Sequence, residues 1–395
     1  MRIAIIGCGA AGAFCGAVLR EMLPSADITL FEAHTKPLAK VAVTGGGRCN
    51  LTNSFAGIRS LAEAYPRGEK LMKRALKVFS QEDTCRWFER HGVQLVLQED
   101  HCWFPASQDA MEIVRTLLRA LDGAVIRTGC RVRKILPPGD VVLENGARES
   151  FDAVVVTTGG APLHPTLLEG LDLPWEAPVP SLFTFLIEGP LRSLAGTVAQ
   201  ASVSLQGTPY RAEGPLLVTD WGVSGPAVLK LSSYAARFLA ESGYRADLVV
   251  NWLQANEQQV RALLAERIAA QPRKLLSSVH PDGLTARLWT FLLERSGVPA
   301  ELRCESVGKN VLNRLTDRLI HDVYPIAGKS PFKEEFVTCG GVSLSAVHPA
   351  TLACKKYPGL YFAGEILDID AITGGFNLQA AWTTAYLVAS AITNP

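Results

Sequence analysis

A glycine-rich turn near the N-terminus is the first feature whose residues could bind a ligand. Gly7, Gly9 and Gly12 are spaced as G-x-G-x-x-G directly after the apolar run 2–6, which is typical of a buried parallel strand. The first glycine permits a tight bend, the second lets the backbone approach a pyrophosphate, and the third lets helix and strand pack closely. The N-terminus of the following helix offers free N–H groups to phosphate.

An acidic residue follows the second predicted strand. Residues 27–31 form an apolar run that ends at Glu32, twenty residues after Gly12. A carboxylate at this place accepts hydrogen bonds from ribose hydroxyls. A lone G-x-G-x-x-G is a weak signal, but strand, helix, strand and acid in register indicate a dinucleotide-binding βαβ unit. The alternative is a glycine-rich turn in an unrelated α/β protein.

A second glycine-rich segment runs from Thr44 to Asn50 as TGGGRCN. Its three glycines expose successive N–H groups that suit an anion, and Arg48 adds a charge for a pyrophosphate or a substrate anion. Asn50 both donates and accepts hydrogen bonds. Cys49 is a candidate thiol near a cofactor, although a small structural residue is the simpler interpretation. An ordinary glycine-rich loop is the alternative for the whole segment.

Two further turns follow apolar runs. Thr157-Thr158-Gly159-Gly160 comes after the predicted strand 151–156, and Gly364-Glu365 comes after the predicted strand 360–363. Ligands of doubly wound sheets bind beyond the carboxyl ends of the strands. We therefore expect Glu365 or Asp368 to bond the ribityl hydroxyls of a flavin; loop acids that only face solvent are the alternative.

The last glycine-rich turn opens an apolar helix near the C-terminus. Gly374-Gly375-Phe376-Asn377-Leu378 begins a pattern that continues to about residue 390. The N–H groups and dipole of its first turn would stabilise negative charge on the N1–C2=O side of a reduced flavin. Most of the remaining helix should be core.

The composition limits the choice of partners and compartment. The chain has 395 residues, 39 basic and 38 acidic residues, and a formal net charge of +1. It is long enough for two or three domains. Without a charge run, we expect neither nucleic acid nor a membrane surface as a partner. No signal peptide or apolar stretch of bilayer length is evident, so a cytoplasmic location is expected.

The nine cysteines are scattered, and none forms a C-x-x-C pair. This favours free thiols in a reducing cytoplasm and no structural zinc. It also disfavours a flavoenzyme with a redox-active disulfide.

The pattern of apolar runs predicts an α/β fold, with a Rossmann-like domain formed by residues 1–177 and 336–395 and an insertion at 178–335. We expect a loop up to about residue 57, a Pro-rich linker at 162–180, and these further elements. Helices are predicted at 60–91, 107–121, 225–240, 255–270 and 283–296, and strands at 124–128, 131–136, 141–145, 181–188, 196–205 and 214–219.

Four segments together resemble the YhiN-like flavoprotein family, also called aminoacetone-oxidase-family or NAD(P)/FAD-dependent oxidoreductases. They are VTGGGRCNLTN at 43–53, VTDWGVSGPAVLKLS at 218–232, VTCGGVSL at 337–344 and GLYFAGEILDIDAITGGFNLQAAW at 359–382. The resemblance implies a glutathione-reductase-type FAD domain, an inserted β-barrel-like and helical region, and non-covalent FAD. One departure is that 161–180, APLHPTLLEGLDLPWEAPVP, replaces a Gly/Ser/Thr-rich run of the family.

The motifs and the resemblance together predict a set of cofactor-binding residues. They are Gly7, Gly9, Ala10, Ala11, Gly12, Glu32, Lys40, Thr44, Gly47, Arg48, Cys49, Asn50, Val132, Thr158, Gly159, Gly160, Gly364, Glu365, Asp368, Gly375, Phe376, Asn377 and Leu378. No residue stands out as a catalytic acid or base, and no metal site is expected.

The predicted function is that of an FAD-dependent oxidoreductase that transfers hydride at flavin N5 to or from an unidentified small molecule. NAD(P)H is a candidate reductant, although the chain lacks a second complete G-x-G-x-x-G. The alternatives are a flavin-dependent RNA-modifying enzyme, which the near-neutral charge disfavours, and a non-catalytic flavin-binding protein. The sequence predicts neither the substrate nor the oligomeric state.

Overall fold

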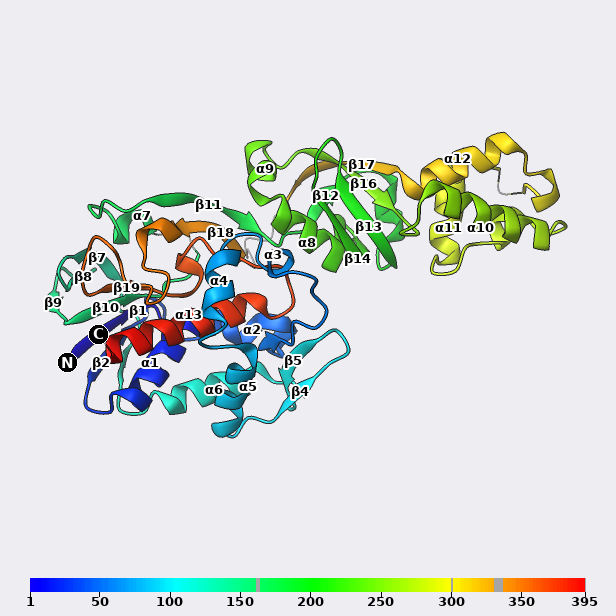
Figure 1. Cartoon of the computed structure of the whole chain (residues 1–395). Helices are drawn as coiled ribbons and strands as arrows, with labels where there is room; N and C mark the ends of the chain where they lie inside the picture. Colours follow the sequence, from blue (N-terminus) through cyan, green and yellow to red (C-terminus); the bar gives the residue numbers. More distant parts are fainter. Residues whose placement is uncertain (161–163, 300, 330–336, 395) are drawn as a thin grey trace. The chain divides into compact units, whose positions relative to one another are not determined.

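The computed structural model describes residues 1–160, 164–299, 301–329 and 337–394. The chain forms two compact units, one of Met1–Val179 with Val337–Pro395 and one of Pro180–Phe336 (Figure 1). The N- and C-terminal segments therefore belong to the same unit. The assignment of the first unit to FAD and of the second to substrate stays a prediction.

A five-stranded parallel sheet forms the centre of the first unit. Its strand order is β19-β10-β1-β2-β6, and all four neighbouring pairs are parallel. Ile6 pairs with both Phe31 and Val156, and Val156 also pairs with Phe362, so the carboxyl ends of four strands lie in register. The strands are β1 (Arg2–Ile6), β2 (Asp27–Phe31), β6 (Val125–Arg127), β10 (Ala153–Val156) and β19 (Leu360–Phe362).

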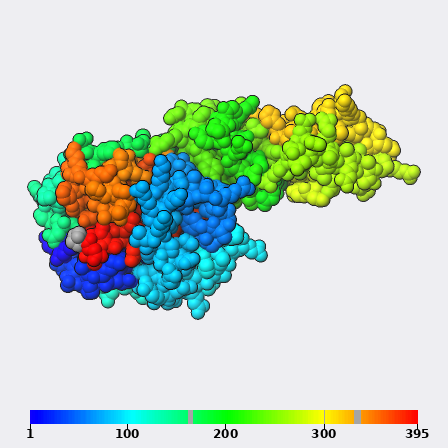
Figure 2. Space-filling model, viewed as in Figure 1, coloured from blue at the N-terminus to red at the C-terminus, as the bar shows by residue number. Residues whose placement is uncertain are grey.

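Two helices from opposite ends of the chain pack against each other in this unit. They are α1 (Ala10–Met22) and α13 (Phe376–Thr393) (Figure 1). Phe14 of α1 lies 5.3 Å from the ring of Trp382 on α13 and 4.8 Å from that of Trp87. On the face drawn in Figure 2, the red C-terminal region borders the dark blue N-terminal region. The C-terminal helix is therefore part of the core around the first βαβ unit.

Other elements of this unit correct two expectations. The expected loop up to residue 57 contains a helix and a strand, and the expected linker at 162–180 contains α7 and β11. Pro178 and Pro180 fit β11 because it lies in a two-stranded sheet, where strand edges need no N–H donor. The helices are α2 (Ala39–Gly47), α3 (Leu61–Ala64), α4 (Glu69–Ala75), α5 (Gln81–Arg90), α6 (Ala110–Ala120) and α7 (His164–Leu167).

Three small sheets complete the first unit. Their strand orders are β3-β5-β4, β7-β8-β9 and β11-β18. Of these strands, only β7 and β8 correspond to predicted ones. The strands are β3 (Thr52–Asn53), β4 (Leu95–Leu97), β5 (Cys102–Pro105), β7 (Val132–Leu136), β8 (Asp140–Leu143), β9 (Arg148–Ser150), β11 (Trp175–Ser181) and β18 (Val337–Val342).

The second unit contains a closed six-stranded barrel, in the order β12-β15-β14-β13-β16-β17. Alternate residues of β13 are buried, as expected for a strand with one face on a core. Together with the parallel sheet, the barrel confirms the predicted fold class. The elements are β12 (Phe185–Ile187), β13 (Val198–Leu205), β14 (Arg211–Thr219), β15 (Gly222–Ser224), β16 (Ala246–Asn251), β17 (Asp322–Lys329), α8 (Pro226–Tyr234) and α9 (Ala236–Glu241).

A helical piece is inserted between the adjacent barrel strands β16 and β17. It contains α10 (Glu257–Ala270), α11 (Ala286–Arg295) and α12 (Lys309–Ile320), of which only α12 was not predicted. Short 3-10 turns connect these helices and occur at a few other places in the chain.

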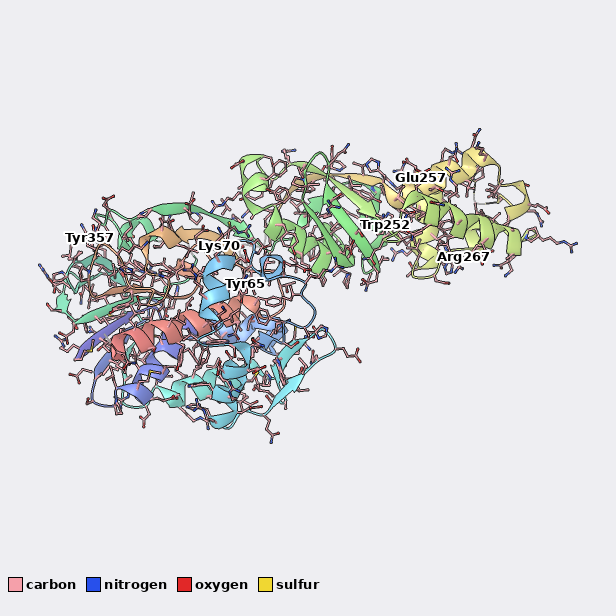
Figure 3. All side chains as sticks on the ribbon, viewed as in Figure 1. Tyr65, Lys70, Trp252, Glu257, Arg267 and Tyr357 are labelled. Atoms are coloured by element: carbon pink, nitrogen blue, oxygen red, sulfur yellow. The ribbon has the colours of Figure 1, made fainter. Side chains whose placement is uncertain are left out.

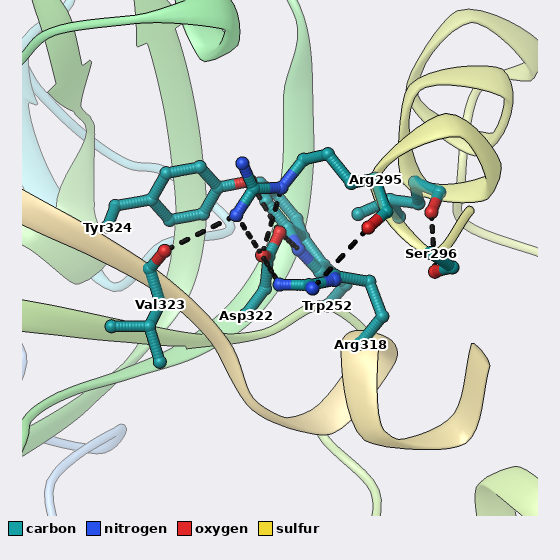
Figure 4. Close-up of polar contacts among 8 residues, drawn as sticks. Trp252, Arg295, Ser296, Arg318, Asp322, Val323 and Tyr324 are labelled. Carbon is teal, nitrogen blue, oxygen red and sulfur yellow. Dashed lines mark hydrogen bonds and ion pairs between the residues drawn. The ribbon is translucent and has the colours of Figure 1, made fainter. Parts of the chain in front are cut away.

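A buried carboxylate joins the helical piece to the barrel (Figure 4). The side chain of Asp322, at the start of β17, is fully buried. It accepts hydrogen bonds from Trp252 Nε1 at 3.0 Å, Arg295 Nη2 at 2.9 Å and Arg318 Nη1 at 2.8 Å. Tyr324 donates to the same carboxylate. Trp252 directly follows β16, Arg295 is the last residue of α11, and Arg318 lies in the last turn of α12. The cluster therefore fixes the C-terminal ends of these two helices against the barrel strands.

Candidate functional site

The turn between β1 and α1 has the geometry of a phosphate-binding turn. A β-carbon at Gly7 would lie 2.6 Å from the carbonyl oxygen of Thr157, and one at Gly12 would overlap the carbonyl oxygen of Gly7. A β-carbon at Gly9 would meet no atom within 4 Å. Gly7 and Gly12 are therefore required by the fold, whereas the bare backbone at Gly9 leaves open space in front of α1.

Glu32 lies at the end of β2 beside this turn. Its Oε2 accepts the N–H of Cys8 at 3.0 Å, and its Oε1 accepts the N–H of His34 at 2.8 Å. Each carboxylate oxygen has a second lone pair, so the side chain can still accept ribose hydroxyls. Burial, and then the charge of Glu32, raises the pKa of the Cys8 thiol to about 12.

The TGGG loop is left-handed. Gly45, Gly46 and Gly47 have φ values of 60°, 69° and 82° in succession, a run that side chains with a β-carbon strongly disfavour. β-Carbons at Gly46 and Gly47 would meet nothing within 4 Å, so this part of the loop is open. The Arg48 guanidinium lies 4.6 Å above the ring of Phe104, which holds it beside the loop.

The two residues after Arg48, Cys49 and Asn50, each place a side-chain atom in the interior. Cys49 is fully buried, and burial raises the pKa of its thiol to about 12, so the geometry supports the structural interpretation over a reactive thiolate. Asn50 Oδ1 is also buried and has no hydrogen-bond partner among the described residues. It lies 2.6 Å from the place that a β-carbon at Gly375 would occupy. Asn50 therefore connects the TGGG loop to the start of α13.

The N-terminus of α13 has no side-chain cap. Its N-cap, Gly375, is left-handed at φ 87°, and its first turn has no acidic residue. The Asn377 side chain instead folds the preceding loop, because its Oδ1 accepts from Ala371 N and its Nδ2 donates to Ala371 O, both at 2.9 Å. The backbone N–H groups of the first turn thus face no side-chain acceptor of their own helix.

Glu365 connects three of the predicted segments. Its Oε1 accepts the N–H of Thr338 at 2.7 Å, and its Oε2 lies 3.7 Å from Lys40 Nζ. A β-carbon at Gly160 would lie 3.0 Å from Oε1. Lys40 is 69 % exposed, so its ion pair with Glu365 is weak and either group is free to exchange it for a ligand.

The predicted residues thus gather around the carboxyl ends of β1, β2, β10 and β19. Val132 belongs to a different sheet. It is the first residue of β7, in an antiparallel sheet separate from the parallel one, and its side chain is buried. The described residues contain no group of three or more His, Cys, Asp or Glu side chains that would hold a metal ion. No described helix has the length and apolar character needed to cross a membrane.

The structure adds residues that the motifs did not identify. Asn53 donates to the carbonyl of Gly374 at 3.0 Å, and Tyr65 donates to that of Phe376 at 2.9 Å. Arg67 forms a two-pronged ion pair with the fully buried Asp370. Burial would lower the pKa of Arg67, but its hydrogen bond to Asp370 and the charge of that carboxylate outweigh burial and raise it. Asn53 lies in the segment 43–53 that resembles the family, whereas nothing in the sequence marked Tyr65 or Arg67 as functional residues.

The sequence matches the HI0933-like protein Rossmann domain over residues 1–391. The chain belongs to the HI0933-like family. A similar protein, 28 % identical over 99 % of this chain and 98 % of its own length, is the 3-dehydro-bile acid delta(4,6)-reductase of Clostridium scindens. Another, 29 % identical over 98 % of this chain and 96 % of its own length, is the ribosomal RNA dihydrouridine synthase of Escherichia coli. A protein of that name from Haemophilus influenzae is 27 % identical.

Solved structures share the fold of this HI0933-like chain. The 3-ketosteroid delta1-dehydrogenase of Sterolibacterium denitrificans aligns over 99 % of both chains with a TM-score of 0.50 and 13 % identity. The FrdA chain of Escherichia coli quinol fumarate reductase aligns over all of this chain and 70 % of its own, also with a TM-score of 0.50, at 14 % identity. The family match confirms the predicted resemblance, and the names of a similar reductase and of a dehydrogenase with this fold agree with the predicted enzyme class.

Proposed function

We propose that the chain binds FAD non-covalently in its first unit and reduces a carbon–carbon double bond conjugated to a carbonyl group in a small molecule. One observation carries the cofactor assignment. Two helices of this unit, α1 and α13, have N-termini without side-chain caps, and they pack against each other. α1 begins after β1, beside the buried carboxylate of Glu32, and α13 begins in the segment that follows β19 of the same parallel sheet. This is where an extended dinucleotide binds in doubly wound folds.

Each part of the site fits one part of FAD. The open backbone at Gly9 and the start of α1 suit the pyrophosphate, and Glu32 suits the ribose. Glu365 or Asp368 suits the ribityl hydroxyls, and the start of α13 suits the N1–C2=O edge of the ring. When bound, FAD would supply two-electron transfer at N5. The other predicted cofactor-binding residues are proposed to line the same site.

The names of two relatives suggest the type of bond. A 3-dehydro acid with delta-4,6 unsaturation has double bonds conjugated to a carbonyl, and uridine has its 5,6 double bond conjugated to a carbonyl of the same ring. Both names therefore describe the saturation of an activated double bond. The step adds two electrons and two protons in total, and NADH or NADPH is the candidate source of the electrons.

The charge of the chain supports a small molecule over RNA. With 39 basic and 38 acidic residues, the chain has no surplus of positive charge for a phosphate backbone. RNA remains the second candidate because two similar proteins are named ribosomal RNA dihydrouridine synthases.

One experiment separates these possibilities. The purified protein should be yellow and should release FAD on denaturation. Anaerobic mixing with NADH and with NADPH identifies the reductant by bleaching of the flavin band. The reduced protein is then mixed with a 4-en-3-one steroid or with a ribosomal RNA transcript. Reoxidation by the enone with formation of the saturated ketone supports the proposal, whereas dihydrouridine formed in the transcript instead favours RNA. A protein that takes up no FAD contradicts the cofactor assignment.

A further inference from the structure

The start of α13 is held by two side chains, Asn53 and Tyr65, that lie outside the predicted set of cofactor-binding residues. Asn53 Nδ2 donates to Gly374 O at 3.0 Å, and Tyr65 OH donates to Phe376 O at 2.9 Å. The partners are 321 and 311 positions apart in the sequence. Tyr65, which is labelled in Figure 3, is completely buried, and Asn53 is buried as well. These contacts are therefore fixed parts of the core.

The two carbonyl groups have a particular place in the chain. Gly374 O shares its peptide group with the N–H of Gly375, and Phe376 O shares its peptide group with the N–H of Asn377. A donor on the carbonyl end of a peptide group polarises the N–H at its other end. Asn53 and Tyr65 thus strengthen two N–H donors at a helix end whose first N–H groups lack intrahelical partners.

A second observation points to a ligand at the same place. Asn50 Oδ1 is buried without a hydrogen-bond partner among the described residues and lies close to Gly375. An unpaired acceptor beside N–H groups that bond no described residue fits a bound group that presents both an oxygen and an N–H. The pyrimidine edge of a flavin, with C2=O next to N3–H, is such a group.

We propose that Asn53 and Tyr65 are positioning residues that raise the reduction potential of the bound flavin through the N–H groups of Gly375 and Asn377. The inference rests on the proposed function, because it requires the flavin at the start of α13. Negative charge on the N1–C2=O edge develops when the flavin is reduced, so stronger donors there favour the reduced form. Burial raises the pKa of the Tyr65 hydroxyl, which therefore remains a donor at all working pH values.

The test is the midpoint potential of Tyr65→Phe, measured by dye-linked titration of the FAD-loaded protein. This change keeps the ring, which packs edge-on against Phe376 with centroids 6.2 Å apart, and removes only the hydroxyl. The affinity for reduced relative to oxidised FAD should fall between three- and tenfold; a tenfold fall corresponds to a potential about 30 mV more negative. Tyr386→Phe is the control, since Tyr386 lies further along α13, half-buried and stacked on Phe79.

A second variant, Asn53→Ser, tests the other contact. Serine is too short to reach Gly374 O but can still accept the N–H of Phe55, which Asn53 Oδ1 accepts at 2.8 Å. The midpoint potential of the FAD-loaded Asn53→Ser variant should shift in the same direction as that of Tyr65→Phe.

The results that would overturn this inference differ from those that would overturn the proposed function. Potentials of Tyr65→Phe and Asn53→Ser equal to the wild type, or shifted equally in Tyr386→Phe, overturn the inference while FAD binding stands. A wild-type protein that takes up no FAD overturns the proposed function and the inference with it. A negative shift in both variants but not in the control supports it.

Discussion

At the scale of single residues, Gly9 offers the sharpest test of the dinucleotide site. The protein has room for a side chain there, because a β-carbon would meet no atom within 4 Å and the backbone is extended. Gly9→Val should therefore leave the far-ultraviolet circular dichroism and the melting temperature of the apoprotein unchanged. FAD occupancy should fall below about a tenth of the wild-type value, because the side chain fills the space proposed for the pyrophosphate.

Gly12→Val provides the matched contrast. A β-carbon at Gly12 would overlap the carbonyl oxygen of Gly7, so this variant should lose its fold together with FAD. If Gly9→Val retained full FAD occupancy, the turn would serve only the fold.

Thiol reactivity provides a second test at this scale. Burial raises the pKa of Cys15 and Cys49 to about 12, whereas Cys130 is half-buried. At pH 8 iodoacetamide should modify Cys130 first, and Cys49 should react only after unfolding, as measured by mass spectrometry of peptides. Equal labelling rates for Cys49 and Cys130 in the folded protein would contradict the burial of Cys49.

The same pKa shifts make the free energy of unfolding depend on pH. The ordinary thiol pKa of 9.0 applies to the unfolded chain, and the folded values of Cys15 and Cys49 are higher. Between about pH 9 and 12 the unfolded chain therefore loses protons that the folded chain keeps. The contribution of these thiols to the free energy of unfolding is complete below pH 9 and declines as the pH rises through this range.

At the scale of elements, the Asp322 cluster determines how firmly the helical piece is attached to the barrel. Asp322→Asn would remove the negative charge and leave Arg295 and Arg318 with a neutral partner. We expect a loss of about 3–5 kcal/mol in the free energy of unfolding, as for other broken buried ion pairs. Urea denaturation followed by intrinsic tryptophan fluorescence measures this, and Trp252, whose Nε1 donates to the same carboxylate, contributes to the signal.

Asp317→Asn on the exposed side of α12 is the control for this change. Asp317 is exposed on the same helix as Arg318, and its substitution should alter the free energy of unfolding by no more than about 0.5 kcal/mol. Similar losses in both variants would mean that overall charge, rather than the buried cluster, is responsible.

At the scale of the whole molecule, ligand-dependent stability tests which nucleotide the first unit takes. A ligand that binds only the folded protein stabilises it by about 2.7 kcal/mol at a concentration of 100 Kd. FAD should therefore raise the melting temperature of the apoprotein by several degrees, measured by differential scanning calorimetry. FMN should have a much smaller effect, because it lacks the adenosine that Glu32 would bind. An equal shift with FMN would contradict the assignment of the Glu32 side of the site.

Much of the fold was determined by local properties of the sequence. The strand–turn–helix of residues 2–22 follows from an apolar run and glycines whose roles depend on their immediate neighbours. The apolar, alternating patterns at 196–205 and 214–219 likewise produced the barrel strands β13 and β14. These features could be predicted because backbone angles and burial patterns are encoded over a few residues.

Other features were decided only by tertiary structure. The loop before α13 contacts Asn53 and Arg67, and the first residue of α13 contacts Tyr65, each from more than three hundred positions away. No periodic pattern in the sequence indicates such contacts. β11 forms within a Pro-rich stretch because a partner strand, β18, arrives from the far end of the chain. The burial of Cys49 also depends on that packing. Hydrogen bonds and burial between distant segments arise from the path of the chain, so the sequence could place the cofactor motifs but not the residues that hold them.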